Sequence, residues 1–123
     1  MNVVDSSGWL EYFADGPNAV HFGAAIENTV ELIVPVISVF EVFKRVLQQR
    51  TEGEALKAVA LMQQGQIIEL DMPLALSAAK LSCELSLPLA DSIILATARA
   101  HQAVLWTQDA DFAGLKGVRY FPK

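Results

Sequence analysis

Cysteine, histidine and basic residues are scarce in this 123-residue sequence, and each shortage excludes a class of protein. The single cysteine, Cys83, rules out an intramolecular disulfide and a cysteine-rich zinc site, and we expect it to be a small buried hydrophobe. The two histidines, His21 and His101, lie beside no acid or nucleophile that would complete a catalytic triad. Nine basic residues against fourteen acids give a net charge of −5, which is unlike a general nucleic-acid binder unless some acids hold a cation.

Long apolar runs and glycine-rich loops are also missing. No apolar run reaches the roughly eighteen residues that a membrane span needs. The first ten residues, MNVVDSSGWL, lack the basic region and apolar stretch of a signal peptide. The seven glycines are scattered, so they form no phosphate-binding loop. We therefore expect a soluble, cytoplasmic protein that does not bind membranes, and the absence of repeats or linkers predicts a single domain.

Short apolar runs alternate with helical stretches along the chain. The runs predict strands at residues 2–5, 32–35, 66–70 and 103–107, and a fifth at 118–121. Helices are expected at 6–13, 21–27, 39–49, 51–65, 73–85 and 90–101, with Ser6 or Ser7 capping the first and Ser38 the third. This alternation is typical of an α/β fold with a mainly parallel sheet of four to five strands, covered on both faces.

Acidic residues at four places differ from the solvated acids elsewhere. Asp5 ends the first predicted strand, and Asp109, with Asp111 close behind, follows the fourth. Glu41 and Asp91 fall in the first turns of apolar helices. In a parallel α/β sheet the strand carboxyl ends share one edge with the following helix starts, so we expect these acids to face a common cleft. Carboxylates held that close repel one another, and Mg²⁺ or Mn²⁺ is their natural counter-charge. The pattern indicates metal-dependent phosphodiester chemistry.

Three of these sites also have an ordinary structural interpretation. Asp91 is a suitable helix N-cap, and Asp109 is a suitable cap for a short helix with Asp111 in its first turn. Asp5 is a suitable start for a turn. Each residue taken alone leaves both interpretations open, and the joint pattern is what favours a metal site.

Glu41 is the hardest of the four to explain without a functional role. It lies in VISVFEVFKRV, with two large apolar residues on each side. Burying an isolated carboxylate is costly. The structural alternative to a shared cation is an ion pair with Lys44 or Arg45 at helical spacing.

Three segments resemble the successive motifs of the PIN-domain family, in particular the VapC-type toxins of type II toxin–antitoxin systems. They are VVDSSGWLEYF, VPVISVFEVFKRV and LPLADSIILATARAHQAVLWTQDADF. The similarity spans essentially the whole chain. It implies a single PIN domain over residues 1–123, folded as a three-layer α/β/α sandwich around the predicted sheet.

The resemblance also implies roles for individual residues. Asp5, Glu41, Asp91 and Asp109 would be catalytic and would hold Mg²⁺ or Mn²⁺, with Asp5 and Asp91 as the most direct ligands and Asp111 as an alternative to Asp109. Supporting hydrogen bonds would come from Ser6 and Thr107, and Ser38 would either join them or only cap its helix. The candidate phosphate contacts are Lys44, Arg45, Arg50 and Arg99.

The activity implied by the resemblance is that of a Mg²⁺-dependent endoribonuclease, a hydrolase that cuts RNA phosphodiester bonds with a metal-activated water. Its implied partners are a structured RNA such as tRNA, a cognate antitoxin protein and a second copy in a homodimer. Surplus apolar helix faces through Ala24, Ile26, Leu56, Val59 and Leu76 are candidate partner surfaces. The alternative is a catalytically weak binding or regulatory module that acts with its antitoxin.

Overall fold

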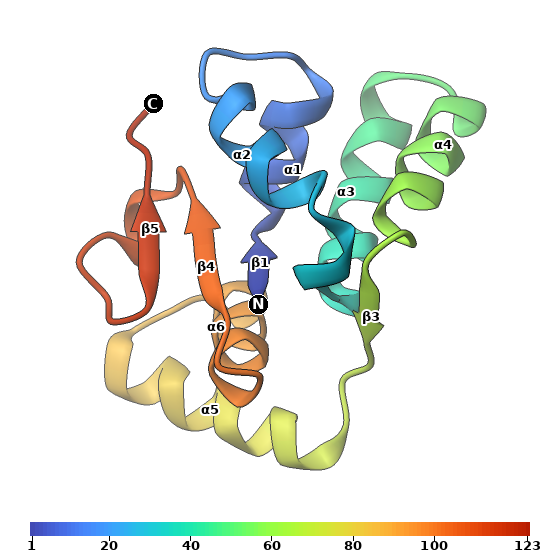
Figure 1. The fold of residues 1–123 in the computed structure, drawn as a ribbon. Coiled ribbons are helices and arrows are strands. Elements are labelled where there is room, and N and C mark those ends of the chain that lie inside the picture. Colours follow the sequence, from blue (N-terminus) through green and yellow to red (C-terminus); the bar gives the residue numbers. More distant parts are fainter.

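The structure is a computed structural model that describes all 123 residues, and it contains one five-stranded sheet with six α-helices around it (Figure 1). The strands are β1 (Asn2–Val4), β2 (Leu32–Pro35), β3 (Gln66–Ile68), β4 (Val104–Thr107) and β5 (Val118–Tyr120). The helices are α1 (Ser6–Phe13), α2 (Ala19–Ile26), α3 (Val36–Gln49), α4 (Glu52–Met62), α5 (Met72–Leu85) and α6 (Leu89–Ala100). Short 3₁₀ turns cover Thr29–Glu31 and Ala110–Phe112.

The sheet has the strand order β3-β2-β1-β4-β5, and every neighbouring pair is parallel. β1 lies at the centre, where Val3 is in register with Ile33 of β2 and Leu105 of β4. The predicted parallel sheet is confirmed, at the upper end of the predicted strand number. All five carboxyl ends therefore lie along one edge of the twisted sheet, and the arrows of β1, β4 and β5 point upward toward it in Figure 1.

Two hydrophobic cores cover the two faces of this sheet. Side chains alternate along each strand, so Val4 and Val34 face one core, together with Trp9 of α1 and Phe22 of α2. Val42 of α3, with Ala58 and Met62 of α4, completes that core. The other core joins Val3, Ile33 and Leu105 to Ile94, Leu95 and Ala98 of α6. This division into helices, sheet and helices is the three-layer sandwich that the sequence predicts.

Helix α5 packs on the outer side of α6 rather than on the sheet. Its buried residues Leu74 and Ala78 meet Ile93 and Ala96 of α6. α6 is consequently buried along almost its whole length, from Ser92 to Ala98. A helix enclosed in this way holds the residues of its first turn in fixed positions.

Two predicted helix starts are wrong, and both involve serine. α1 is capped by Asp5, whose side chain accepts from the backbone N–H of Gly8, and not by Ser6 or Ser7. α3 begins at Val36 instead of Val39, so Ser38 lies inside the helix and caps nothing. The fixed φ of Pro35, −61°, already suits the residue before a helix, and no hydroxyl cap is needed there.

The expected burial of Cys83 is also wrong, because this side chain is exposed. Leu74 and Ala78 are buried at helical spacing, with Leu81 and Leu85 partly buried in the same series, and Cys83 falls on the opposite side of α5. Of the candidate partner surfaces, Leu56 and Leu76 are largely exposed whereas Ile26 is buried in a core.

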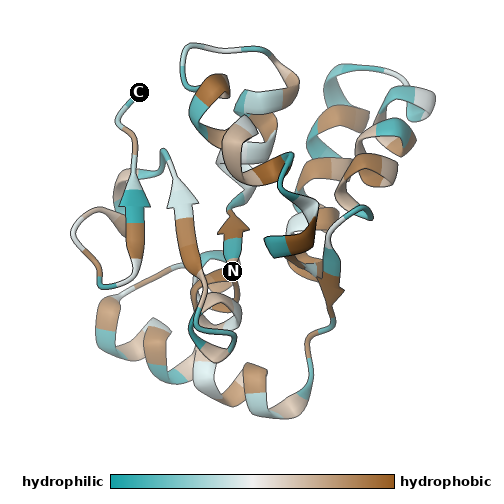
Figure 2. Ribbon diagram, viewed as in Figure 1, coloured by the Kyte–Doolittle hydropathy of each residue, from teal (hydrophilic) through white to brown (hydrophobic).

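Figure 2 shows that β4 and β5 are hydrophobic at their amino ends and lose this character toward their arrowheads, whereas the arrowheads of β1 and β3 are hydrophobic. No single helix has the length and apolar character to cross a membrane; α5 and α6 meet that test only as a pair, bent by 115° at the break between them.

Candidate functional site

Asp5 stands where β1 ends and α1 begins. Its backbone N–H donates to the carbonyl of Trp106 in β4 at 3.1 Å, which continues the sheet by one residue. Its carboxylate accepts from the N–H of Gly8 at 2.9 Å, from the Ser7 hydroxyl at 2.8 and 2.9 Å, and from the Thr107 hydroxyl at 2.7 Å. The side chain is only 2% exposed. These bonds from three directions fix both carboxylate oxygens.

Glu41 lies on the second turn of α3 and is half-buried. Its Oε1 atom accepts a hydrogen bond of 2.5 Å from the Ser6 hydroxyl, 35 positions earlier in the chain. The alternative of an ion pair to Lys44 or Arg45 is wrong, because the structure's one ion pair joins the amino terminus to Glu31. The two sequence neighbours of Glu41 differ in solvent exposure, since Val42 is fully buried and Phe40 is 60% exposed.

Asp91 is the third residue of α6, and Pro88 occupies the N-cap position. The interpretation of Asp91 as the cap of this helix is therefore wrong. A carboxylate in the first turn is favoured by the helix dipole, but this one makes no hydrogen bond to the helix backbone. It is left free to face the other acids.

Asp109 does cap a short helix, as one interpretation predicted. Its carboxylate accepts from the N–H of Asp111 at 2.9 Å at the start of the 3₁₀ turn. Its own N–H donates to the Thr107 hydroxyl at 2.9 Å, and that hydroxyl donates in turn to Asp5. Capping uses one oxygen, Oδ1, and leaves Asp109 available to the cluster.

The carboxylates of four residues, Asp5, Glu41, Asp109 and Asp111, act on that of Asp91. Burial, followed by the charges of Asp109, Asp5, Glu41 and Asp111 in that order, raises the pKa of Asp91 to about 7. Burial raises the pKa of Asp5 to about 6, although hydrogen bonds from Thr107, Gly8 and Ser7 oppose this rise. The acids that sequence analysis singled out are thus brought together. Their mutual repulsion is uncompensated by any lysine or arginine ion pair.

This cluster has the composition of a hard-cation site. Asp91, Asp109 and Asp111 each offer a carboxylate oxygen within 4.8 Å of the others. The charges of Asp5 and Glu41 also act on Asp91. Oxygen-only ligands suit Mg²⁺ and Mn²⁺, and a cation among them would relieve the repulsion that raises the pKa of Asp91. The donor set therefore fits a divalent metal ion, and both Asp109 and Asp111 are within reach of it.

The remaining candidate residues divide between the site and other places. Ser6 and Thr107 hydrogen-bond the acids as expected. The Ser38 hydroxyl is fully buried and has no hydrogen-bond partner. Lys44 lies over the Phe40 ring at 5.8 Å on the solvent side of α3.

Arg99 is misplaced as a phosphate contact near the acids. It lies eight residues beyond Asp91 on α6, which is about 12 Å along the helix axis toward the opposite edge of the sheet. Its guanidinium donates to the carbonyl of Lys116, in the turn before β5, at 3.4 Å.

Sequence reasoning missed two residues that hold Asp5, namely Ser7 and Gly8. The signal was present in the segment Asp5–Gly8, because an aspartate before a helix accepts from the groups two and three positions later. Gly8 has a second reason for its identity. A Cβ atom there would lie 2.6 Å from Val4 Cγ1 and 2.9 Å from Phe22 Cδ1, so only glycine lets α1 approach β1 and α2 this closely.

Comparison with known proteins adds independent observations. The PIN domain family model matches residues 3–118. No curated protein matches the sequence. A chain of a toxin–antitoxin complex from Klebsiella pneumoniae is similar over 100% of both chains, with 26% identity and a TM-score of 0.81.

Two further structures are similar in fold. VapC20 of Mycobacterium tuberculosis, described as a toxin that cleaves the sarcin–ricin loop, has 16% identity and a TM-score of 0.76, and covers 97% of this chain and 99% of its own. A chain of the DNA-bound VapBC complex from Salmonella typhimurium has 15% identity and a TM-score of 0.75 over 99% and 98% of the two chains.

Proposed function

The chain belongs to the PIN-domain family, and from this premise we propose that it is a VapC-type toxin that acts as a Mg²⁺- or Mn²⁺-dependent endoribonuclease. The observation that carries the proposal is the cluster of five carboxylates, Asp91 and the four that act on it, at the carboxyl edge of the sheet. The similarity to a toxin–antitoxin complex and to a toxin that cleaves the sarcin–ricin loop supports the toxin role and an RNA substrate.

In this proposal Asp5 and Asp91 hold the cation directly, with Glu41 and either Asp109 or Asp111 completing the set. When bound, a divalent cation supplies charge stabilisation for the phosphate oxygens and lowers the pKa of a water molecule. The protein supplies the orientation. Thr107, Ser7 and the Gly8 amide hold Asp5 in one position, and Ser6 holds one oxygen of Glu41 while the other stays free.

Partners follow from the same family membership. A cognate antitoxin and a second copy of the chain are proposed, since large apolar side chains such as Leu76 on α5, Phe40 on α3 and Leu89 at the start of α6 stand exposed. The substrate is proposed to be a structured RNA such as tRNA, and the whole chain is proposed to act as a single PIN domain.

The deciding experiment is RNA cleavage with and without Mg²⁺, for the native chain and for Asp5→Asn and Asp91→Asn. We expect each substitution to lower the cleavage rate by at least about a hundredfold, because it removes a charge from the cation site without changing side-chain size. Asp71→Asn is the matched control. Asp71 caps α5 by accepting from the N–H of Leu74, and asparagine caps equally well, so this variant should cleave normally.

Metal titration separates this proposal from the alternative of a catalytically weak binding module. A nuclease requires Mn²⁺ or Mg²⁺ binding that disappears in Asp91→Asn. A native chain that binds no divalent cation, or an Asp91→Asn variant that cleaves RNA at the native rate, would contradict the proposed mechanism.

A further inference from the structure

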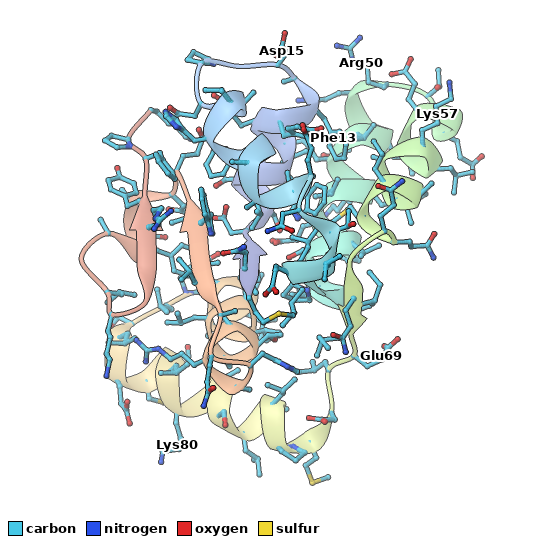
Figure 3. The ribbon with its side chains drawn as sticks, in the orientation of Figure 1. Phe13, Asp15, Arg50, Lys57, Glu69 and Lys80 are labelled. Carbon is cyan, nitrogen blue, oxygen red and sulfur yellow. The ribbon has the colours of Figure 1, made fainter.

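A groove of about 720 Å³ lies between α1, α3 and α4, beside the acidic cluster. Leu10 and Phe13 of α1 form one wall. The other wall is formed by Arg45 on α3, Arg50 at the carboxyl end of α3 and Lys57 on α4. Figure 3 shows the Arg50 and Lys57 side chains near each other at the upper right, with Phe13 beside them and Lys80 at the far end of the molecule. The groove is thus a feature of the same half of the protein as the carboxyl edge.

The charge of this groove is opposite to that of the whole chain. Four of the nine basic residues line it, namely Arg45, Arg50, Lys57 and Lys123, although the chain carries a net charge of −5. The groove has two acids, Glu11 and Glu54, and neither forms an ion pair with these cations. The Glu11 carboxylate accepts instead from the backbone N–H of Asn18 at 2.9 Å. The positive charge is therefore available to a ligand.

The groove adjoins the acidic cluster through Ser7. Ser7, which lines the groove, donates its hydroxyl to both oxygens of Asp5. On α3, Arg45 follows Glu41 by one helical turn, and Arg50 lies nine residues beyond Glu41, which is about 13 Å along the axis. Arg45 therefore lies near the acids, and Arg50 lies farther from them along α3.

We propose that this groove binds the phosphates of the RNA strand on one side of the bond that is cut. This inference rests on the proposed nuclease function. Several cations at increasing distance from the acids suit a backbone of repeated negative charges, and a span of about 13 Å accommodates a few phosphates. Phe13, half-buried and stacked on Trp9 at 5.7 Å between ring centroids, offers an aromatic surface to a base. This combination of cations and an aromatic ring is typical of sites for single strands.

The test measures binding of a fluorescent single-stranded RNA of about twelve nucleotides, a length within the range of one such site. Binding is measured in the Asp91→Asn background, so that the RNA stays intact. Adding Arg50→Gln or Lys57→Gln should weaken RNA affinity roughly fivefold in each variant. This factor is the upper end of the contribution that an exposed ion pair makes. Each should also reduce the slope of log affinity against log salt by about 0.7. In the otherwise native chain, kcat/KM for RNA should fall by the same factor.

Lys80→Gln on α5 is the matched control, because it removes one exposed cation at the far end of the molecule (Figure 3). It should change neither affinity nor salt dependence. Far-UV circular dichroism confirms that each variant is folded, as expected for substitutions at exposed positions.

The outcomes separate the groove from the nuclease. Cleavage by the native chain with unchanged RNA affinity in Arg50→Gln and Lys57→Gln would overturn the groove and leave the nuclease standing. If RNA binding depends on these cations but the native chain does not cleave RNA, the groove would stand and the nuclease would be overturned. Variants that keep their RNA affinity but lose binding to an antitoxin protein would assign the groove to that protein and overturn the inference. A native chain that neither binds nor cleaves RNA would overturn both proposals.

Discussion

Thr107 and Asp5, 102 positions apart in the sequence, are joined by a buried hydrogen bond of 2.7 Å from the threonine hydroxyl to Oδ2 of the carboxylate. The same hydroxyl accepts from the N–H of Asp109 at 2.9 Å. One side chain therefore ties the acid after β1 to the acid after β4. It is this bond that most strongly opposes the rise in the pKa of Asp5 that burial causes.

Replacing this hydroxyl should weaken the site while leaving the acids in place. Thr107→Val removes the hydrogen bond, so the pKa of Asp5 should rise further and the pH midpoint of activity should move upward. We expect metal affinity and RNA cleavage near neutral pH to fall about 10- to 100-fold, the usual effect of losing a group that orients a ligand. Thr107→Ser keeps a hydroxyl and should retain most activity. An unchanged pH midpoint in Thr107→Val would contradict the role assigned to this bond.

The stability of the metal-free chain should fall as pH rises from about 4 to about 7. The pKa values of Asp5 and Asp91 are raised from 3.8 to about 6 and about 7, so in this interval the folded chain binds more protons than the unfolded chain. The contribution is fully present below 3.8 and is lost as each carboxyl ionises. Thermal unfolding with a chelator tests this.

Asp91→Asn provides the reference for that experiment. It should be more stable than the native chain at high pH and no more stable at low pH, because only the ionised carboxylate is repelled by its neighbours. A difference in melting temperature that does not change with pH would show that Asp91 does not titrate in this interval.

Metal binding should show the opposite pH dependence. A cation competes with protons for Asp5 and Asp91, so Mn²⁺ affinity should increase as pH rises through about 6 and about 7. Mn²⁺ should accordingly raise the melting temperature of the native chain at high pH and have little effect at low pH. Isothermal titration at several pH values measures the affinity directly. Equal binding at low and high pH would place the metal elsewhere.

Gly8→Ala should destabilise the fold and disturb the site together. The added methyl group would clash with Val4 and Phe22, and overpacking of this kind costs about 1–3 kcal/mol. A shift of α1 would also move the N–H that holds Asp5. Gly53→Ala is the control, since a methyl group there meets nothing closer than the Thr51 hydroxyl at 3.9 Å and should slightly stabilise α4. Chemical denaturation measures both changes.

The sequence predicts the strands well because all of them are short and most of their residues are apolar, and β1, β2 and β4 lie between helical layers on both sides. It predicts helix starts less well. Asp5 and Ser6 are both good caps, and only the folded geometry, in which the Gly8 N–H points at Asp5, decides between them. The predicted burial of Cys83 was wrong for a related reason. The side of α5 that is buried depends on where α6 lies, and amino-acid composition carries no such information.

The site was predicted from topology rather than from any local signal. Asp5 and Asp109 follow adjacent strands β1 and β4, so a parallel sheet brings them together whatever lies between. The hydrogen bonds that hold the acids in place were harder to predict from the sequence. Ser6 was expected to support the site, but its partner Glu41 lies on a separate helix, and the spacing of α1 and α3 is set by the packing of Trp9 and Val42. Arg99 was expected near the acids because it is close to Asp91 in the sequence, but eight residues of α6 separate the two along the helix axis.

The strand order has a consequence for synthesis. β4 is the fourth strand to leave the ribosome but lies beside β1, the first, and it carries Thr107, which holds Asp5, just before Asp109. A nascent chain that ends before β4 has Asp5, Glu41 and Asp91 but cannot assemble them with their partners. The acidic cluster would therefore assemble only after β4 has been made and has paired with β1.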